Sequence, residues 1–155
     1  MAVRKIQADF NSDYILIGVA SSLREYKFCF HLNQLLSISL TKQPDLFFET
    51  TDRTRQSSFS VFSTANPDLK NNYRVFANKS TGEFLLPEAA SYDFLVQVLG
   101  KYSEAEAEQL VAGIKQFPGS LICAAIPPRK IKNPERLIYE EQTSVVRPRI
   151  IRNLI

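Results

Sequence analysis

The sequence predicts an α+β domain: a mainly antiparallel, twisted sheet with two helices on one face. Two segments, one beginning near Ser22 and one at Ser103, carry apolar residues at helical spacing. Most other segments are short, with the alternating or continuous apolar residues typical of strands, and turn sequences separate them. With 155 residues, of which 45% are hydrophobic, the chain can bury one core as a single domain.

The first two strands are predicted at residues 5–10 and 14–19. Apolar and polar residues alternate in the first, which indicates a half-buried strand, whereas the second is apolar on both faces and therefore more central. The short Asn-Ser-Asp turn at residues 11–13 predicts that the two strands form a hairpin.

The first helix is predicted to begin at Ser22, because Glu25 follows three residues later and the two can form a capping box. Its polar residues form one narrow stripe, and apolar residues cover most of the remaining circumference. The stripe consists of Arg24, Lys27, His31 and Gln34. We therefore expect the rest of this helix to be well covered by protein.

The middle of the chain predicts a meander of short antiparallel strands. The expected strands are residues 38–40, 46–49, 59–63, 73–78 and 84–86. The expected turns are residues 44–45, 66–68 and 80–82, which contain proline, aspartate, asparagine, serine or glycine.

The last third predicts a β-α-β unit. Residues 92–99 and 121–126 are expected strands, and Ser103 with Glu106 caps the helix between them. Because such crossovers are right-handed, the two strands should lie parallel, either adjacent or with one strand between them. Gly113, within a helix otherwise rich in alanine and glutamate, indicates a close backbone contact.

The segment LPEAASYDFLVQVLG lies between the meander and the β-α-β unit. It resembles the motif of the IPExxVDY family of small bacterial proteins: Leu86, Pro87 and Glu88 match the first part, and Asp93 and Phe94 match the last. This chain has one residue more between Glu88 and Asp93 than the motif allows. The resemblance covers roughly residues 3–126 and implies no particular activity.

Two interpretations of this motif stay open. Glu88 and Asp93 could lie near each other and support acid–base chemistry or cation binding. Alternatively, the motif is structural: Pro87 ends a strand, Glu88 or Ser91 caps a turn, and Asp93 holds the entry to the next strand. The sequence favours the structural interpretation, because proline and acidic residues next to strands commonly serve the local backbone.

The C-terminal segment has its own character. Residues 129–155 hold seven basic and three acidic residues, a net charge of +4, although the whole chain carries only +3. Three arginines alternate with apolar residues near the end, as in an extended strand: Arg147, Arg149, Ile150, Ile151 and Arg152. We expect residues 1–132 to form the domain and residues 133–155 a basic, apolar arm, docked on a sheet edge or on a partner.

Composition excludes several classes of site. Cys29 and Cys123 are far apart and the chain has one histidine, so no zinc site or disulfide framework is expected. The five glycines do not cluster into a phosphate-binding loop, and no apolar stretch approaches the length that spans a bilayer. We expect no metal, no cofactor, a cytoplasmic location and no membrane association.

Three classes of function remain. The preferred hypothesis is a non-catalytic interaction or regulatory module, which could bind another protein or associate with itself. The second is a nucleic-acid or ribosome-associated factor that uses the basic arm. The third is an enzyme of unfamiliar type, with a pocket formed by Glu88, Asp93 or His31; no catalytic residue can be assigned. Aromatic residues near arginines, such as Phe59 and Tyr73, could stack on bases but are more typical of a core.

Overall fold

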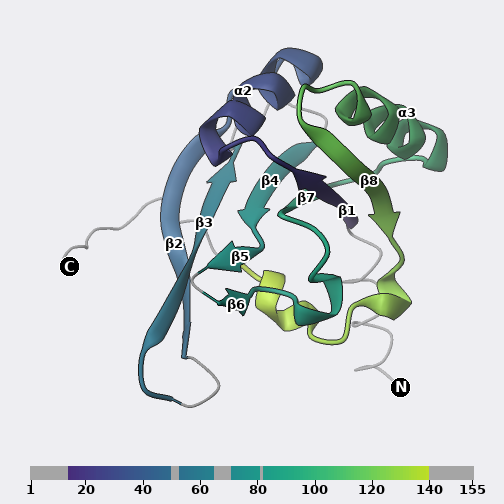
Figure 1. Cartoon of the computed structure of the whole chain (residues 1–155). Coiled ribbons are helices and arrows are strands. Elements are labelled where there is room, and N and C mark those ends of the chain that lie inside the picture. Colours follow the sequence, from purple (N-terminus) through teal and green to yellow (C-terminus); the bar gives the residue numbers. More distant parts are fainter. Residues whose placement is uncertain (1–13, 50–52, 65–70, 81, 140–155) are drawn as a thin grey trace.

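The computed structural model describes residues 14–49, 53–64, 71–80 and 82–139. Its main feature is a six-stranded sheet in the order β2-β3-β4-β7-β1-β8, in which every pair of neighbours is antiparallel (Figure 1). The strands of this sheet are β1 (Tyr14–Ser21), β2 (Thr41–Glu49), β3 (Gln56–Ser63), β4 (Asn72–Ala77), β7 (Phe94–Leu99) and β8 (Ser120–Ile126). The predicted α+β class with a mainly antiparallel sheet is confirmed.

Both helices cover the same face of the sheet. The helices are α2 (Glu25–Leu36) and α3 (Glu104–Lys115), and Figure 1 shows them side by side over the sheet. Phe28 and Leu32 of α2 and Ile114 of α3 are fully buried in one core cluster with strand residues such as Ile17. The ring of Phe28 stacks on Phe94, with ring centroids 4.5 Å apart. Neither helix of the described residues is long and apolar enough to cross a membrane.

Short elements cover the opposite face. They are a two-stranded sheet, β5 (Lys79–Ser80) with β6 (Glu83–Phe84), and three 3-10 turns, η1 (Pro87–Ala89), η2 (Pro128–Lys130) and η3 (Pro134–Leu137). A second core cluster lies beneath them and contains Leu85, Leu86 and Leu137 together with Leu16 and Phe76 of the sheet. The sheet is therefore buried on both faces, by helices on one side and by turns on the other.

The predicted β-α-β unit is confirmed. β7 and β8 each pair antiparallel with β1, so they run parallel to each other with one strand between them. Gly113 makes the predicted close contact, since a Cβ atom there would lie 2.9 Å from the side chain of Leu35 on α2. Residues 5–10, the expected hairpin partner of β1, lie outside the described residues; β1 itself pairs with β7 and β8.

Three predictions about the meander are wrong in detail. Residues 38–40 are not a strand, and the expected turn at residues 44–45 lies inside β2. There, two residues of β2 stand opposite one residue of β3, between the pairs Gln43–Val61 and Leu46–Phe59. Pro44 has no N–H to donate, and the strand accommodates it as a bulge without reversing. The third wrong prediction is the strand at residues 84–86: β6 ends at Phe84, and η1 begins at Pro87.

The predicted start and coverage of α2 are also wrong. The residue that precedes the helix is Arg24, which makes no side-chain capping bond. The serines serve the junction with β1: Ser21 Oγ accepts from the N–H of Leu23, and the N–H of Ser22 donates to the carbonyl of Gly119. Only Phe28, Cys29 and Leu32 of α2 are buried. Tyr26 is 64% exposed and Phe30 52% exposed, because the sheet supports one side of the helix alone.

The cap of α3 matches the prediction and provides a test. Ser103 Oγ accepts from the N–H of Glu106 at 3.1 Å, and Glu106 Oε1 accepts from the N–H of Ser103 at 2.9 Å. Ser103→Ala should lower the free energy of unfolding by about 1 kcal/mol, because one N–H of the first turn loses its partner. Ser22→Ala, at a serine that does not cap a helix, should change stability by less than about 0.5 kcal/mol. Urea unfolding of both variants measures this, and equal losses would contradict the assignment.

Candidate functional site

The motif segment is organised around one buried amide. Asn78 follows β4 and is fully buried. Its Nδ2 donates to the carbonyl oxygens of Ala89 (2.9 Å) and Tyr92 (3.0 Å), and its Oδ1 accepts from the N–H of Leu86 (2.8 Å). A single side chain thus satisfies three backbone groups of the turn that carries the motif.

Asp93 holds the start of the central strand β7. Its Oδ2 accepts from the N–H of Ser21 at 2.8 Å, and its Oδ1 forms an ion pair with Lys79 Nζ at 2.9 Å. Its own N–H donates to the carbonyl of Val19. Phe94, the next residue, lies in the core against Phe28. Asp93 therefore joins β1, β5 and β7 at one end of the sheet.

Glu88 has a separate role, at the other end of the motif turn. Its Oε2 accepts from the backbone N–H groups of Lys132 (2.8 Å) and Asn133 (3.2 Å). Glu88 and Asp93 line different hollows, one with Lys130 and Ile131 and the other with Ser21 and Arg24. The structure does not bring the two carboxylates together in one pocket.

The remaining candidates for chemistry lie elsewhere. His31 is half-buried on α2, and its ring lies 5.3 Å from that of Phe117. Cys29 and Cys123 are free, buried thiols, and burial raises the pKa of Cys29 to about 12 and that of Cys123 to about 11. Phe59 and Tyr73 are buried in the two cores. Among the described residues, no group of three or more His, Cys, Asp or Glu side chains could hold a metal ion.

The most distinctive exposed feature is the outer strand β8. It pairs with β1 on one side, and within the described residues no strand pairs with its other side. Leu121 is 73% exposed and Ile122 is 53% exposed. Leu121 is the extra residue of a bulge, because Ser21 of β1 pairs with Ser120 and Ala20 pairs with Ile122. Natural edge strands usually carry charges, prolines or a cover that prevent pairing. β8 contains no charged residue and no proline; it has a bulge at Leu121, at the start of the strand, and pairs regularly with β1 from Ile122 to Ile126.

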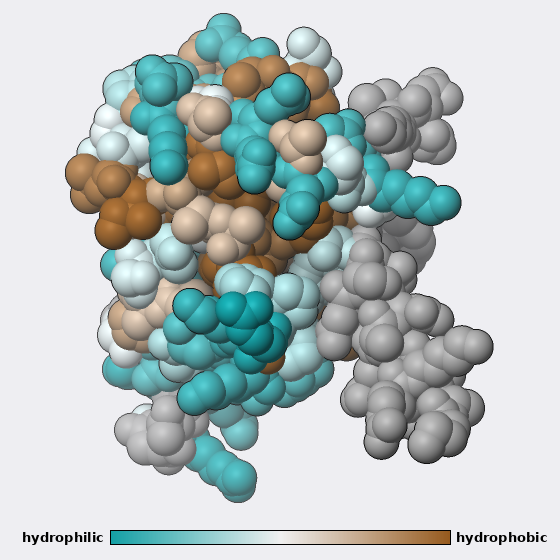
Figure 2. All heavy atoms as spheres, turned by 90° about the vertical axis from the view of Figure 1, so that its right-hand side faces the viewer, coloured by the Kyte–Doolittle hydropathy of each residue, from teal (hydrophilic) through white to brown (hydrophobic). Residues whose placement is uncertain are grey.

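A groove lies beside this strand, between β8 and α3. Ala107 and Val111 of α3 and Cys123 and Ala125 of β8 line a hollow of about 480 Å³. Three charged residues of α3 border it: Glu104, Glu108 and Lys115. Figure 2 shows this side of the molecule, where hydrophobic atoms run across the middle of the face between hydrophilic side chains. We call Leu121, Ile122 and Ala125 of β8 with Ala107, Val111 and Ala112 of α3 the β8–α3 surface.

Little in the amino-acid pattern indicates this surface. Residues 121–126 read as a buried strand, and Cys123 and Ile126 are indeed buried. A continuous apolar run is typical of a central strand, so the pattern does not reveal that β8 is the last strand of the sheet. The position at the edge follows from the strand order, which places β7 and β8 on either side of β1.

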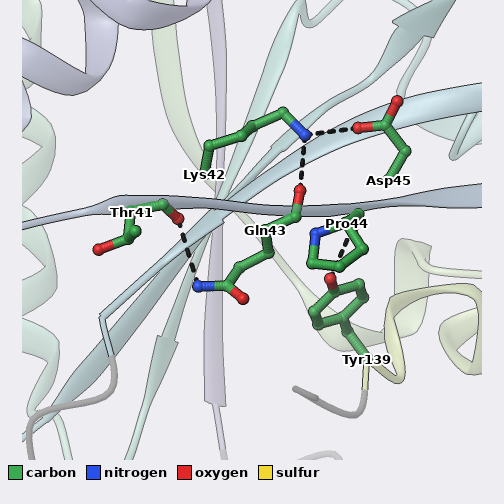
Figure 3. Close-up of polar contacts among 6 residues, drawn as sticks. All are labelled: Thr41, Lys42, Gln43, Pro44, Asp45 and Tyr139. Carbon is green, nitrogen blue, oxygen red and sulfur yellow. Dashed lines mark hydrogen bonds and ion pairs between the residues drawn. The ribbon is translucent and has the colours of Figure 1, made fainter. Parts of the chain in front are cut away.

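The opposite edge of the sheet is different. At the bulge of β2, the hydroxyl of Tyr139 donates to the carbonyl of Pro44 at 2.5 Å, and Lys42 Nζ donates to Asp45 Oδ1 and to the carbonyl of Gln43, each at 2.6 Å (Figure 3). The guanidinium of Arg136 lies 4.3 Å from the centre of the Phe48 ring. This edge is thus charged, interrupted by proline and contacted by the C-terminal segment.

The first part of the predicted arm therefore belongs to the second core. Leu137 is 1% exposed and Tyr139 is 8% exposed. The rest of the predicted arm, including Arg147, Arg149, Ile150, Ile151 and Arg152, lies outside the described residues.

No family model matches the chain, and a search of the curated proteins finds no relative.

The role of Asn78 provides a second test. Asn78→Ala leaves two carbonyl groups and one N–H without their partner in a buried site, so the free energy of unfolding should fall by about 3 kcal/mol. Asn33→Ala, which removes a single partly buried bond to the N–H of Leu40, should cost about 1 kcal/mol. Chemical denaturation measures both.

A further variant separates hydrogen bonding from loss of volume at this position. Asn78→Asp keeps the acceptor for Leu86 but turns a carboxylate toward two carbonyl oxygens, so at neutral pH it should destabilise at least as much as Asn78→Ala. A stable Asn78→Asp protein would show that the amide donor is not needed.

The contacts of Leu137 and Tyr139 provide a third test. A chain that ends at Lys132 lacks both side chains and should be about 4 kcal/mol less stable than a chain that ends at Tyr139, because each buries most of its surface. Thermal and urea unfolding of the two truncated chains measure the difference. Equal stability would mean that these contacts contribute little to the folded state.

Proposed function

We propose that this protein is a non-catalytic interaction module of the cytoplasm that binds a partner protein through the β8–α3 surface. The observation that carries the proposal is the exposure of Leu121 and Ile122 on a strand with an unpaired edge among the described residues. Such an edge offers backbone N–H and C=O groups to an added strand, and exposed apolar side chains beside it supply buried area. The neighbouring groove can accept side chains of that strand.

The polar groups of the motif support the same proposal, because each has a task in the fold. Glu88 holds the backbone at Lys132 and Asn133, and Asp93 holds Ser21 and Lys79. We take the chain to be a relative of the IPExxVDY family in which the motif positions serve the fold. The free, buried thiols of Cys29 and Cys123 fit a reducing compartment such as the cytoplasm.

Fewer observations support the two alternative functions, nucleic-acid binding and catalysis. The nucleic-acid hypothesis depends on Arg147, Arg149 and Arg152, which lie outside the described residues, and it stays a prediction. Its test needs a chain that ends at Tyr139, since a shorter one loses core side chains. The enzyme hypothesis needs Glu88, Asp93 or His31 in a common pocket, and no described hollow is lined by two of these three residues.

The proposal predicts the result of affinity capture from the native host with the full-length, tagged chain. Proteins captured by the wild type should be lost with the double variant Leu121→Lys/Ile122→Lys, because two charges on the edge oppose strand addition. Phe47→Lys is the matched control: Phe47 is 58% exposed on β2, similar to Ile122, and its replacement should leave capture unchanged. Quantitative mass spectrometry compares the three samples, and circular dichroism verifies that each is folded.

An equal set of proteins captured by the wild type and by the β8 variant would overturn the proposal. The same conclusion follows if Phe47→Lys abolishes capture and the β8 variant does not, since the active surface would then lie at β2.

A further inference from the structure

We infer that the partner that fits the β8–α3 surface is a second copy of this chain, paired antiparallel along β8 about a two-fold axis. This inference rests on the proposed function and identifies its partner. In this arrangement, the two six-stranded sheets join into one continuous sheet, and the helices α3 of the two copies lie side by side on the same face.

The first support is the distribution of charge along α3. Glu104 and Glu108 lie in its first half and Lys115 at its end, and all three border the groove. Ala112 lies between them, on the same stripe of the helix. A two-fold axis reverses the direction of α3 in the second copy, so Lys115 of each copy faces the acidic half of the other helix, with Glu104 directly opposite and Glu108 one turn nearer the axis. A surface with this pattern is complementary to itself.

The contacts between α3 and β8 locate the axis. Ser120 Oγ donates to the carbonyl of Ile114 at 2.8 Å, so Ile114 is level with the first residue of β8. The midpoint between Glu104 and Lys115 lies four to five residues before Ile114, which is about 7 Å along a helix. The same distance along a strand is about two residues. The axis that opposes the charges therefore passes near Ile122.

The side chains of β8 fit this register. Ile122 of one copy stands opposite Ile122 of the other, on the face away from the helices, and apolar β-branched pairs stabilise antiparallel strands. Leu121, the extra residue of the β8 bulge, lies directly beside this pair. Leu121 and Ile122, the exposed large apolar residues of β8, both become covered. The small, exposed side chain of Ala112, two to three residues from the axis, lets the two helices approach closely.

Light scattering coupled to gel filtration tests the inference on the full chain. The wild type, whose single chain has a mass of 17.6 kDa, should elute with twice that mass at about 0.1 mM, and Leu121→Lys/Ile122→Lys with the mass of one chain. Phe47→Lys should retain the double mass. A wild type that stays a single chain at this concentration, or a β8 variant that still forms pairs, would overturn the inference.

Charge reversal tests the orientation. Lys115→Glu should weaken the pair about tenfold, since it places like charges opposite each other at two symmetric positions. The triple variant Lys115→Glu/Glu104→Lys/Glu108→Lys restores opposite charges and should recover the affinity. Lys27→Glu, at an exposed lysine of α2, is the control and should have no effect. Lack of recovery in the triple variant would contradict the antiparallel arrangement of α3.

A cross-link tests the register without relying on a weakened variant. Ile122→Cys should form a disulfide with its copy on mild oxidation, because residues directly opposite in antiparallel strands have Cα atoms about 4.5–5.5 Å apart, within the range that a disulfide bridges. Phe47→Cys is the control of similar exposure, and the wild type shows the background from Cys29 and Cys123, which are buried. Equal cross-linking of both variants would refute the register.

The outcomes separate this inference from the proposed function. The wild type could be a single chain while the β8 variant fails to capture the proteins that the wild type captures. That result would refute self-association but support the β8–α3 surface as the binding site of another protein. If the pair forms through β8 and no other protein is captured, the surface serves self-association. A single chain whose captured proteins do not depend on β8 would overturn both.

Discussion

The side-chain amide of Asn78 is the interaction on which the rest of the structure depends. It is fully buried, and its three hydrogen bonds hold Leu86, Ala89 and Tyr92 at fixed distances from the end of β4. The backbone N–H of Asn78 also donates to the carbonyl of Asp93. Both ends of the motif turn are thereby fixed, so β7 can begin at Phe94 between β4 and β1. Without this amide, the backbone that leads into β7 would lose the hydrogen bonds that position it.

The same turn explains how the second face of the sheet is covered. It carries Leu85, Leu86 and Ala89 into the second core, and Glu88 extends from it to the backbone at Lys132 and Asn133. The chain after β8 is held against this face, where Leu137 becomes buried. A motif that looks like a pair of acids in sequence is, in the described structure, a joint between two chain segments about 45 residues apart.

Local signals of the sequence predicted local features well. The capping box at Ser103, the β-α-β unit and the close contact at Gly113 depend on short spacings and on a general rule of handedness. The errors arose where a distant contact decided the outcome. Ser22 resembles a helix cap, but its N–H donates to the carbonyl of Gly119. The neighbouring Ser21 bonds to Leu23 and Asp93. Pro44 resembles a turn, but pairing with β3 continues on both sides of it.

The candidate site could not be predicted for the same reason. Asn78 looks like the last residue of a strand, and its role depends on groups eight to fourteen residues further along the chain. Leu121 and Ile122 look like core residues, and only the strand order shows that they lie at the rim of the sheet. Tyr26 and Phe30 on α2 are exposed because the sheet packs against only one side of this helix.

The bulge of β2 has a consequence for assembly. Pro44 offers no N–H, its carbonyl already accepts from Tyr139, and the charge of Lys42 stands beside it, so this end of the sheet resists a further strand. Among the described strands, only β8 then offers an edge to a further strand. If two copies pair along β8, both open edges are covered, and the resulting pair is finite and cannot extend into fibrils.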